Sequence, residues 1–127
     1  LGNTIERVII DENHSTYKKM SFNCLECNEL LENLYTKNKK NIIICGVESH
    51  ICVQQTCLDL TKKDFRAHIV VDAIGSRNLI DHKISIRRLE LNNVDITTAE
   101  SIIFELCRTA DRKEFKEISS IIKERTI

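Results

Sequence analysis

Apolar and polar positions follow two patterns that alternate along this 127-residue chain. Short unbroken apolar runs predict strands of a parallel sheet, because such strands are covered on both faces. Apolar positions at helical spacing predict the helices between them. The strands are expected at residues 41–45, 66–71 and 94–96, and the helices at residues 23–35, 52–62, 81–92, 98–107 and 113–123. This order predicts an α/β fold with right-handed crossovers.

The segment NIIICGVESHICVQQT, residues 41–56, carries the most specific chemical signal. An apolar strand ends at Gly46, and a short polar turn leads to Cys52 where a helical pattern opens. Unpaired N–H groups and the dipole at a helix N-terminus favour the thiolate form of a cysteine. We therefore interpret Cys52 as a candidate nucleophile. The alternative is a buried helix cysteine without chemistry, since free cysteines are often buried.

This segment resembles the nucleophile segment of the isochorismatase-like cysteine hydrolases, a family that includes nicotinamidases. The match consists of Gly46 and Val47, four less constrained residues, and Cys52. The branch that the chain most resembles is the isochorismatase domain-containing proteins of animals and protists. Further pieces agree in order and spacing: Leu1-Gly2-Asn3-Thr4, Lys19-Met20-Ser21-Phe22-Asn23, His68-Ile69-Val70-Val71-Asp72-Ala73, Gly75-Ser76-Arg77, Ile96-Thr97-Thr98-Ala99-Glu100 and Phe115-Lys116-Glu117-Ile118.

The resemblance implies a doubly wound parallel sheet in a three-layer α/β/α fold, of which residues 1–127 form the C-terminal portion. The first strands of the family's domain have no counterpart here, so the sequence is expected to begin inside the domain. The strand at residues 42–44 then lacks a neighbour on one side. An apolar edge of this kind favours pairing with another chain or aggregation.

The catalytic set that the resemblance implies is an Asp on the first strand, a Lys on a central strand, and the Cys. Lys19 and Cys52 match the second and third, and the alignment of Phe22 selects Lys19 over Lys18. In the family, the catalytic Asp precedes all of the segments that match this chain. Asp11 follows an apolar run, but it lies too close to Lys19 and lacks the usual Asp-x-Gln pattern. We interpret Asp11 as a surface carboxylate.

The turn before the cysteine has further implied roles. Backbone N–H groups of Cys52 and of the turn at Val47 and Glu48 are expected to hold an oxyanion. The resemblance also implies a cis peptide bond between Val47 and Glu48. His50 is either an acid–base partner in place of the Asp or a specificity or surface residue. Phe22 is either a pocket residue or a core aromatic.

We interpret Asp72 and the cysteines other than Cys52 as structural residues. Asp72 is expected to hold the turn at residues 75–77 rather than to act as a triad acid. The chain has six cysteines, and its α/β pattern favours free thiols in a reducing compartment over a disulfide scaffold. Cys24 and Cys27 form a CxxC motif inside a helical pattern, without further ligands at metal-binding spacing. We predict no metal and no cofactor.

Composition narrows the choice of partner and compartment. Lys plus Arg and Asp plus Glu each number 19, which does not favour nucleic-acid or anionic-membrane binding. No apolar run approaches the roughly 20 residues of a membrane-spanning helix. We expect a cytoplasmic protein. The alternative is a mitochondrial protein whose targeting signal lies on a preceding segment. The family commonly self-associates, so a homo-oligomer is expected.

The resemblance therefore implies a cysteine hydrolase that acts on a small-molecule substrate with an amide or related C–N bond. Retention of Cys52 favours this activity over isochorismate cleavage, whose enzymes lack the cysteine nucleophile. One alternative is a non-catalytic interaction module, because the catalytic Asp has no counterpart. Another is a thiol redox protein that uses Cys24 and Cys27.

Overall fold

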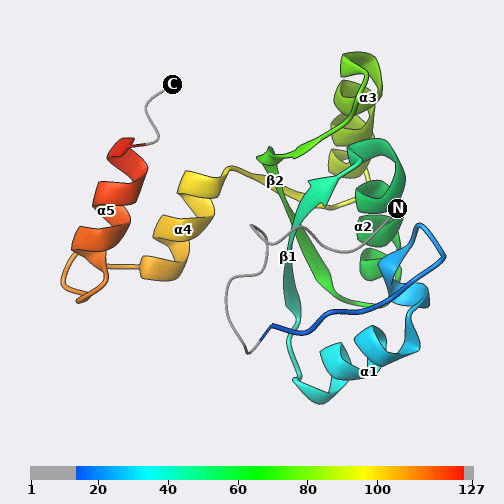
Figure 1. Ribbon diagram of the computed structural model, residues 1–127, viewed down its shortest axis with the longest axis horizontal. Helices are drawn as coiled ribbons and strands as arrows, with labels where there is room; N and C mark the ends of the chain where they lie inside the picture. The colour runs from blue at the N-terminus through cyan, green and yellow to red at the C-terminus, as the bar shows by residue number, and fades with distance from the viewer. Residues whose placement is uncertain (1–13, 125–127) are drawn as a thin grey trace.

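The computed structural model describes residues 14–124, and a three-stranded parallel sheet in the order β1-β2-β3 lies at its centre (Figure 1). The strands are β1 (Asn41–Val47), β2 (Arg66–Gly75) and β3 (Asp95–Thr97). The register of β1 on β2 shifts between Ile44 and Gly46. All pairings are parallel, so the predicted α/β class is confirmed.

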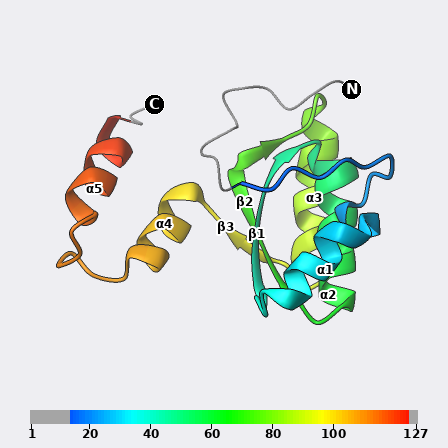
Figure 2. The ribbon, with the colours of Figure 1, turned by 60° about the horizontal axis from the view of Figure 1, so that its bottom comes forward.

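Helices lie on both sides of this sheet, as Figure 2 shows. On one side are α1 (Asn28–Thr36), α2 (Gln54–Lys62) and α3 (Leu79–Glu90). On the other side are α4 (Ala99–Cys107), which contacts β2, and α5 (Phe115–Glu124), which contacts α4. This arrangement agrees with the three-layer order expected from the sequence. No helix of residues 14–124 is long and apolar enough to cross a membrane.

The core lies between the sheet and the helices α2 and α3. Leu60 of α2, Ile69 of β2 and Leu89 of α3 are fully buried. Burying a side chain of this size stabilises a fold by about 1.5–3 kcal/mol. The cluster around them is completed by Leu25, Val53, Cys57, Phe65, Ala67 and Val94.

The helix predicted at residues 23–35 is interrupted in the structure. A 3-10 helix spans Cys24–Glu26, and Cys27 is extended (φ −82°, ψ 102°) before α1 begins. The side chain of Asn23 accepts a hydrogen bond of 3.0 Å from the backbone N–H of Leu25. This cap closes a tight turn that buries Leu25, so a single continuous helix was the wrong prediction. Cys24 begins the 3-10 helix and Cys27 is the extended residue after it, and both are free thiols.

The start of α4 also differs by one residue from the prediction. The N-cap is Thr98, whose hydroxyl accepts a hydrogen bond of 3.3 Å from the N–H of Ser101. The spacing of Thr97 and Glu100 is that of a capping box, but Thr97 is the last residue of β3 and does not cap the helix. Asp72 accepts a hydrogen bond of 2.8 Å from the N–H of Ala99. The carboxylate that we expected at the turn of residues 75–77 thus supports the first turn of α4.

Burial alternates along β1, contrary to the expectation that both of its faces are covered. Ile42 and Ile44 pack against the core, whereas Ile43, Cys45 and Val47 are exposed. The reason is that α1 and α2 cover one face only. Within residues 14–124, β1 pairs with β2 alone, so its second edge carries no strand.

This edge is expected to make the chain self-associate. Replacing the half-exposed Ile43 by Lys should weaken self-association at least about tenfold, because a charge on the edge strand opposes pairing. Sedimentation velocity over a range of concentrations measures the effect. Ile84→Lys on α3 is the matched control, since Ile84 is 59% exposed but distant from the edge. Equal association of both variants would show that β1 is not the contact.

Candidate active site

Cys52 lies in a π-helical turn that joins β1 to α2. The turn spans Ser49–Val53, and α2 continues from Gln54. Cys52 is therefore inside the turn that precedes α2 instead of on the first turn of an α-helix. Single π-helical turns occur frequently at functional sites. The turn lies on the side of the sheet that α2 covers (Figure 1).

The backbone ahead of Cys52 has two special conformations. Gly46 has φ +122°, a region that residues with a Cβ rarely adopt. The peptide bond between Val47 and Glu48 is cis, the geometry that the resemblance implies for this turn. The carbonyl of Glu48 accepts hydrogen bonds from the N–H groups of Ile51 (3.1 Å) and Val53 (3.3 Å). Together these features close the chain tightly between the strand and Cys52.

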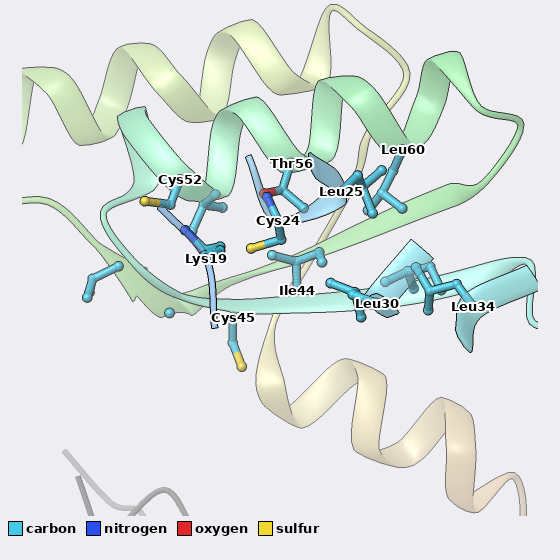
Figure 3. A pocket seen from close by; sticks show the side chains of 14 residues that line it. Lys19, Cys24, Leu25, Leu30, Leu34, Ile44, Cys45, Cys52, Thr56 and Leu60 are labelled. Atoms are coloured by element: carbon cyan, nitrogen blue, oxygen red, sulfur yellow. The ribbon is translucent and has the colours of Figure 1, made fainter. Parts of the chain in front are cut away.

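A cavity of about 430 Å³ opens beside Cys52. Figure 3 shows Lys19, Cys24, Cys52 and Thr56 toward one end of it, with Leu30 and Leu34 toward the other. The cavity is therefore polar at one end and apolar over the rest of its length. Its remaining lining residues are Leu25, Ile42, Ile44, Cys45, Gly46, Val47, Val53 and Leu60.

Lys19 lines the cavity with Cys52, whereas Lys18 does not. Its Nζ donates hydrogen bonds to the carbonyl oxygens of Ser21 (2.8 Å) and Phe22 (3.1 Å). These two carbonyls hold the ammonium group at the polar end of the cavity. The expectation that this lysine lies on a strand is wrong for the described chain, because no strand pairs with the irregular segment around Lys19.

Neither Phe22 nor His50 belongs to the cavity wall. Phe22 is 57% exposed, because the 3-10 turn that follows it directs Leu25 inward instead. His50 is half-buried and its Nδ1 lies 2.9 Å from the hydroxyl of Ser76. The possible pocket role of the two residues therefore stays a prediction. The alternative of a core aromatic is excluded for Phe22 by its exposure.

Two residues of the polar end were missed by sequence reasoning. The hydroxyl of Thr56 accepts a hydrogen bond of 3.0 Å from the N–H of Cys24. This bond joins the 3-10 turn to α2, and both residues line the cavity. Thr56 could have been found, because residues four apart on a helix share a face and Thr56 follows Cys52 by that spacing. Cys24 had no such signal, since its position depends on the unpredicted interruption at Cys27.

Glu48 has an electrostatic partner on the next loop. Its carboxylate accepts hydrogen bonds from the backbone N–H of Arg77 (3.0 Å) and from Nη2 of the same residue (3.2 Å). The backbone hydrogen bond, followed by the side-chain bond and the guanidinium charge, lowers the pKa of Glu48. Glu48 therefore stays ionised as an anchor of the turn.

Cys57, on the next turn of α2 after Val53, provides an internal reference for thiol chemistry. Burial, assisted by the neighbouring Cys24, raises the pKa of Cys57 from 9.0 to about 12. We expect Cys57 to resist iodoacetamide in the folded protein at pH 8, because the thiolate is the reactive form. Peptide mass spectrometry before and after denaturation measures this. Rapid modification of Cys57 in the folded chain would contradict its burial.

The raised pKa of Cys57 also makes the free energy of unfolding depend on pH in the alkaline range. The folded state keeps the Cys57 proton above pH 9, where the unfolded state loses it, so stability decreases as pH rises from 9 toward 12. The variant Cys57→Ala removes this contribution. Denaturation at pH 8 and pH 10 should therefore show a smaller pH dependence in the variant than in the natural sequence. An identical pH dependence would contradict the assignment.

The chemistry of the described residues does not point to a metal centre. Within residues 14–124, no group of three or more His, Cys, Asp or Glu side chains is arranged to hold a metal ion. No Asp or Glu of this range lines the cavity. Asp11, which we interpreted as a surface carboxylate, lies outside the described residues.

Comparison with known proteins decides the family. The model of the isochorismatase domain matches residues 3–101. The chain belongs to the isochorismatase domain family. It is 38% identical to isochorismatase family protein 1B of Dictyostelium discoideum, over 98% of this chain and 63% of that protein. It is 34% identical to isochorismatase domain-containing protein 1 of Danio rerio, over 97% of this chain and 44% of that protein.

A solved structure of the same architecture extends this comparison. It is described as the MAR1 ribonuclease of Caenorhabditis elegans, with a TM-score of 0.86, 32% identity, and coverage of 96% of this chain and 63% of that chain. The chain thus spans between 44% and 63% of the lengths of these three proteins.

Proposed function

We propose that this isochorismatase domain protein is a cysteine hydrolase in which the Cys52 thiolate attacks the carbonyl of a small amide or related C–N substrate. The observation that supports this most directly is the placement of Cys52 and Lys19 at the same polar end of one cavity. The turn that carries Cys52 begins with the cis bond between Val47 and Glu48. Membership of the family supports the hydrolase class.

The proposed reaction proceeds in two steps. The Cys52 sulfur forms a bond to the carbonyl carbon, the C–N bond breaks, and the amine leaves with the proton that the thiol gave up. Water then adds to the acyl thioester, the S–C bond breaks, and a carboxylic acid and the free thiol result. Lys19 places a positive charge at the same end of the cavity as the Cys52 sulfur. Backbone N–H groups of Cys52 and of the turn around Glu48 stabilise the oxyanion.

The shape of the cavity suits an acyl group with an apolar body. Its polar end would hold the reacting carbonyl, and the leucine side chains at the other end would contact the rest of the substrate. The test is ammonia release from a panel of small aliphatic and aromatic primary amides under reducing conditions. Turnover that Cys52→Ala abolishes supports the proposal, and the absence of turnover throughout the panel contradicts it.

One specific observation favours a second candidate. No carboxylate of residues 14–124 lines the cavity, so a base equivalent to the family's Asp is not provided by this part of the chain. A cavity without a carboxylate is what we expect of a non-catalytic interaction module. The two candidates differ in the reactivity of Cys52: a nucleophile should react with iodoacetamide faster than the exposed Cys45, whereas a module has no such requirement.

Three related properties belong to the same proposal. Self-association is supported by the edge of β1, which pairs with no second strand of residues 14–124. A cytoplasmic location is supported by the free cysteines among the described residues, which suit a reducing compartment. Ribonuclease activity, named for the Caenorhabditis elegans relative, is not favoured for this chain, because its 19 basic and 19 acidic residues provide no excess of positive charge for a phosphate backbone.

A further inference from the structure

Three consecutive residues ahead of Cys52 contact the segment that joins β2 to the first turn of α3. This segment, residues 76–82, is called the clamp segment below. Glu48 pairs with Arg77 by the two hydrogen bonds described above. The hydroxyl of Ser49 lies 3.0 Å from Nδ1 of His82. His50 contacts the hydroxyl of Ser76 at 2.9 Å through Nδ1 and the carboxylate of Asp81 at 4.0 Å through Nε2.

The middle contact is the most constrained of the three. Ser49 is fully buried, and His82 Nδ1 is the partner of its hydroxyl. A buried hydroxyl that loses its partner bears the whole cost of its desolvation. The turn would then have to move until the hydroxyl reached another partner or water. The Ser49 contact therefore constrains the backbone of the turn as well as the side chain.

The clamp segment is itself held in place. The hydroxyl of Ser85, which is 1% exposed, donates a hydrogen bond of 2.8 Å to the carbonyl of His82. The side chain of Asn78 donates a hydrogen bond of 3.1 Å to Asp81. Leu89, one turn after Ser85 on the same helix, is fully buried in the core. Ser49 and His50 thus contact the start of α3, a helix that is held in place by the burial of Leu89 in the core.

We propose that the clamp segment fixes the conformation of residues 48–53, and that His82 is a positioning residue for Cys52. The role of Cys52 in this inference rests on the proposed function, but the clamp itself does not. Backbone donors and a nucleophile must be held within about 0.5 Å of their productive geometry. Contacts at three successive residues supply that restraint from a separate element.

The test uses hydrogen exchange, measured by mass spectrometry on the full 127-residue chain. His82→Phe keeps a ring of similar size without Nδ1, and His82→Asn offers an amide group near the same place. We expect exchange in residues 48–53 to be at least about tenfold faster in H82F and within about twofold of the natural sequence in H82N, since one buried hydrogen bond is lost and then restored. Lys83→Ala, at the exposed neighbour of His82, is the matched control and should change nothing. Exchange in α4 should be the same in all variants.

Each outcome decides the inference. Unchanged exchange of residues 48–53 in a folded H82F variant overturns it, and so does a failure of H82N to restore protection. If H82F exchanges rapidly in every element, Ser76→Ala takes its place. A local increase confined to residues 48–53 then supports the clamp, and no increase overturns it.

Alkylation of Cys52 separates this inference from the proposed function. With iodoacetamide we expect the Cys52 rate to decrease about tenfold in H82F and to recover in H82N, while the exposed Cys45 reacts equally in all variants. If Cys52 of the natural sequence reacts no faster than Cys45, the proposed nucleophile fails, whereas the exchange result still decides the clamp. If exchange changes and the Cys52 rate does not, the positioning role of His82 is overturned.

Discussion

Cys52→Ala is expected to reduce amide hydrolysis by at least about ten-thousandfold, because removal of a nucleophile eliminates the covalent route. The fold should be unaffected, since Cys52 is only half-buried and lines the cavity. Steady-state ammonia release, measured together with circular dichroism, gives both quantities. The loss should appear in kcat, because the thiolate reacts after the substrate has bound.

The control for this variant is Cys27→Ala. Cys27 is a half-buried free thiol that does not line the cavity. We expect this variant to keep the activity of the natural sequence within about twofold. Comparable losses in both variants would show that general damage to the thiols, and not the removal of one nucleophile, lowers the rate.

The largest effect on stability is expected at Ile69. Ile69 is fully buried at the centre of the sheet, and Ile69→Ala should lower the free energy of unfolding by about 2–5 kcal/mol through lost burial and the cavity left behind. Urea denaturation followed by circular dichroism measures the change. A loss of this size is a large fraction of the about 5–15 kcal/mol that stabilises an ordinary domain.

Ile96 provides a matched control for Ile69. It is the register partner of Ile69 on β3, but its side chain is 39% exposed. Ile96→Ala should therefore cost clearly less than Ile69→Ala, since burial and not residue type sets the loss. Equal costs at the two positions would place the core elsewhere than between the sheet and the helices α2 and α3.

Much of the fold was predictable, because strands and helices alternate with distinct periods. Local contacts explain where the prediction failed. The interruption at Cys27 depends on the Asn23 cap and on the burial of Leu25, neither of which the helical spacing reveals. The exposure of Ile43 was missed because an unbroken apolar run looks the same whether one or both faces of a strand are covered.

The candidate site also contains features that the sequence predicted and contacts that it did not. Cys52, Lys19 and the cis bond after Val47 were expected from a local motif and from a resemblance, and the structure brings the two side chains to one cavity. The contacts of Ser49 with His82 and of His50 with Ser76 join positions 33 and 26 residues apart. No periodicity connects positions at such separations, so these contacts required the structure.

The central claim, that Cys52 is an acylated nucleophile, is tested most directly by trapping the intermediate. A small activated acyl donor, such as a p-nitrophenyl ester, would be mixed with the protein, quenched in acid, and followed by intact-mass and peptide mass spectrometry. We predict a mass increase equal to one acyl group, located on the peptide that contains Cys52 and absent in Cys52→Ala. Acylation that appears on other cysteines at the same rate, or that persists unchanged in Cys52→Ala, would contradict the claim.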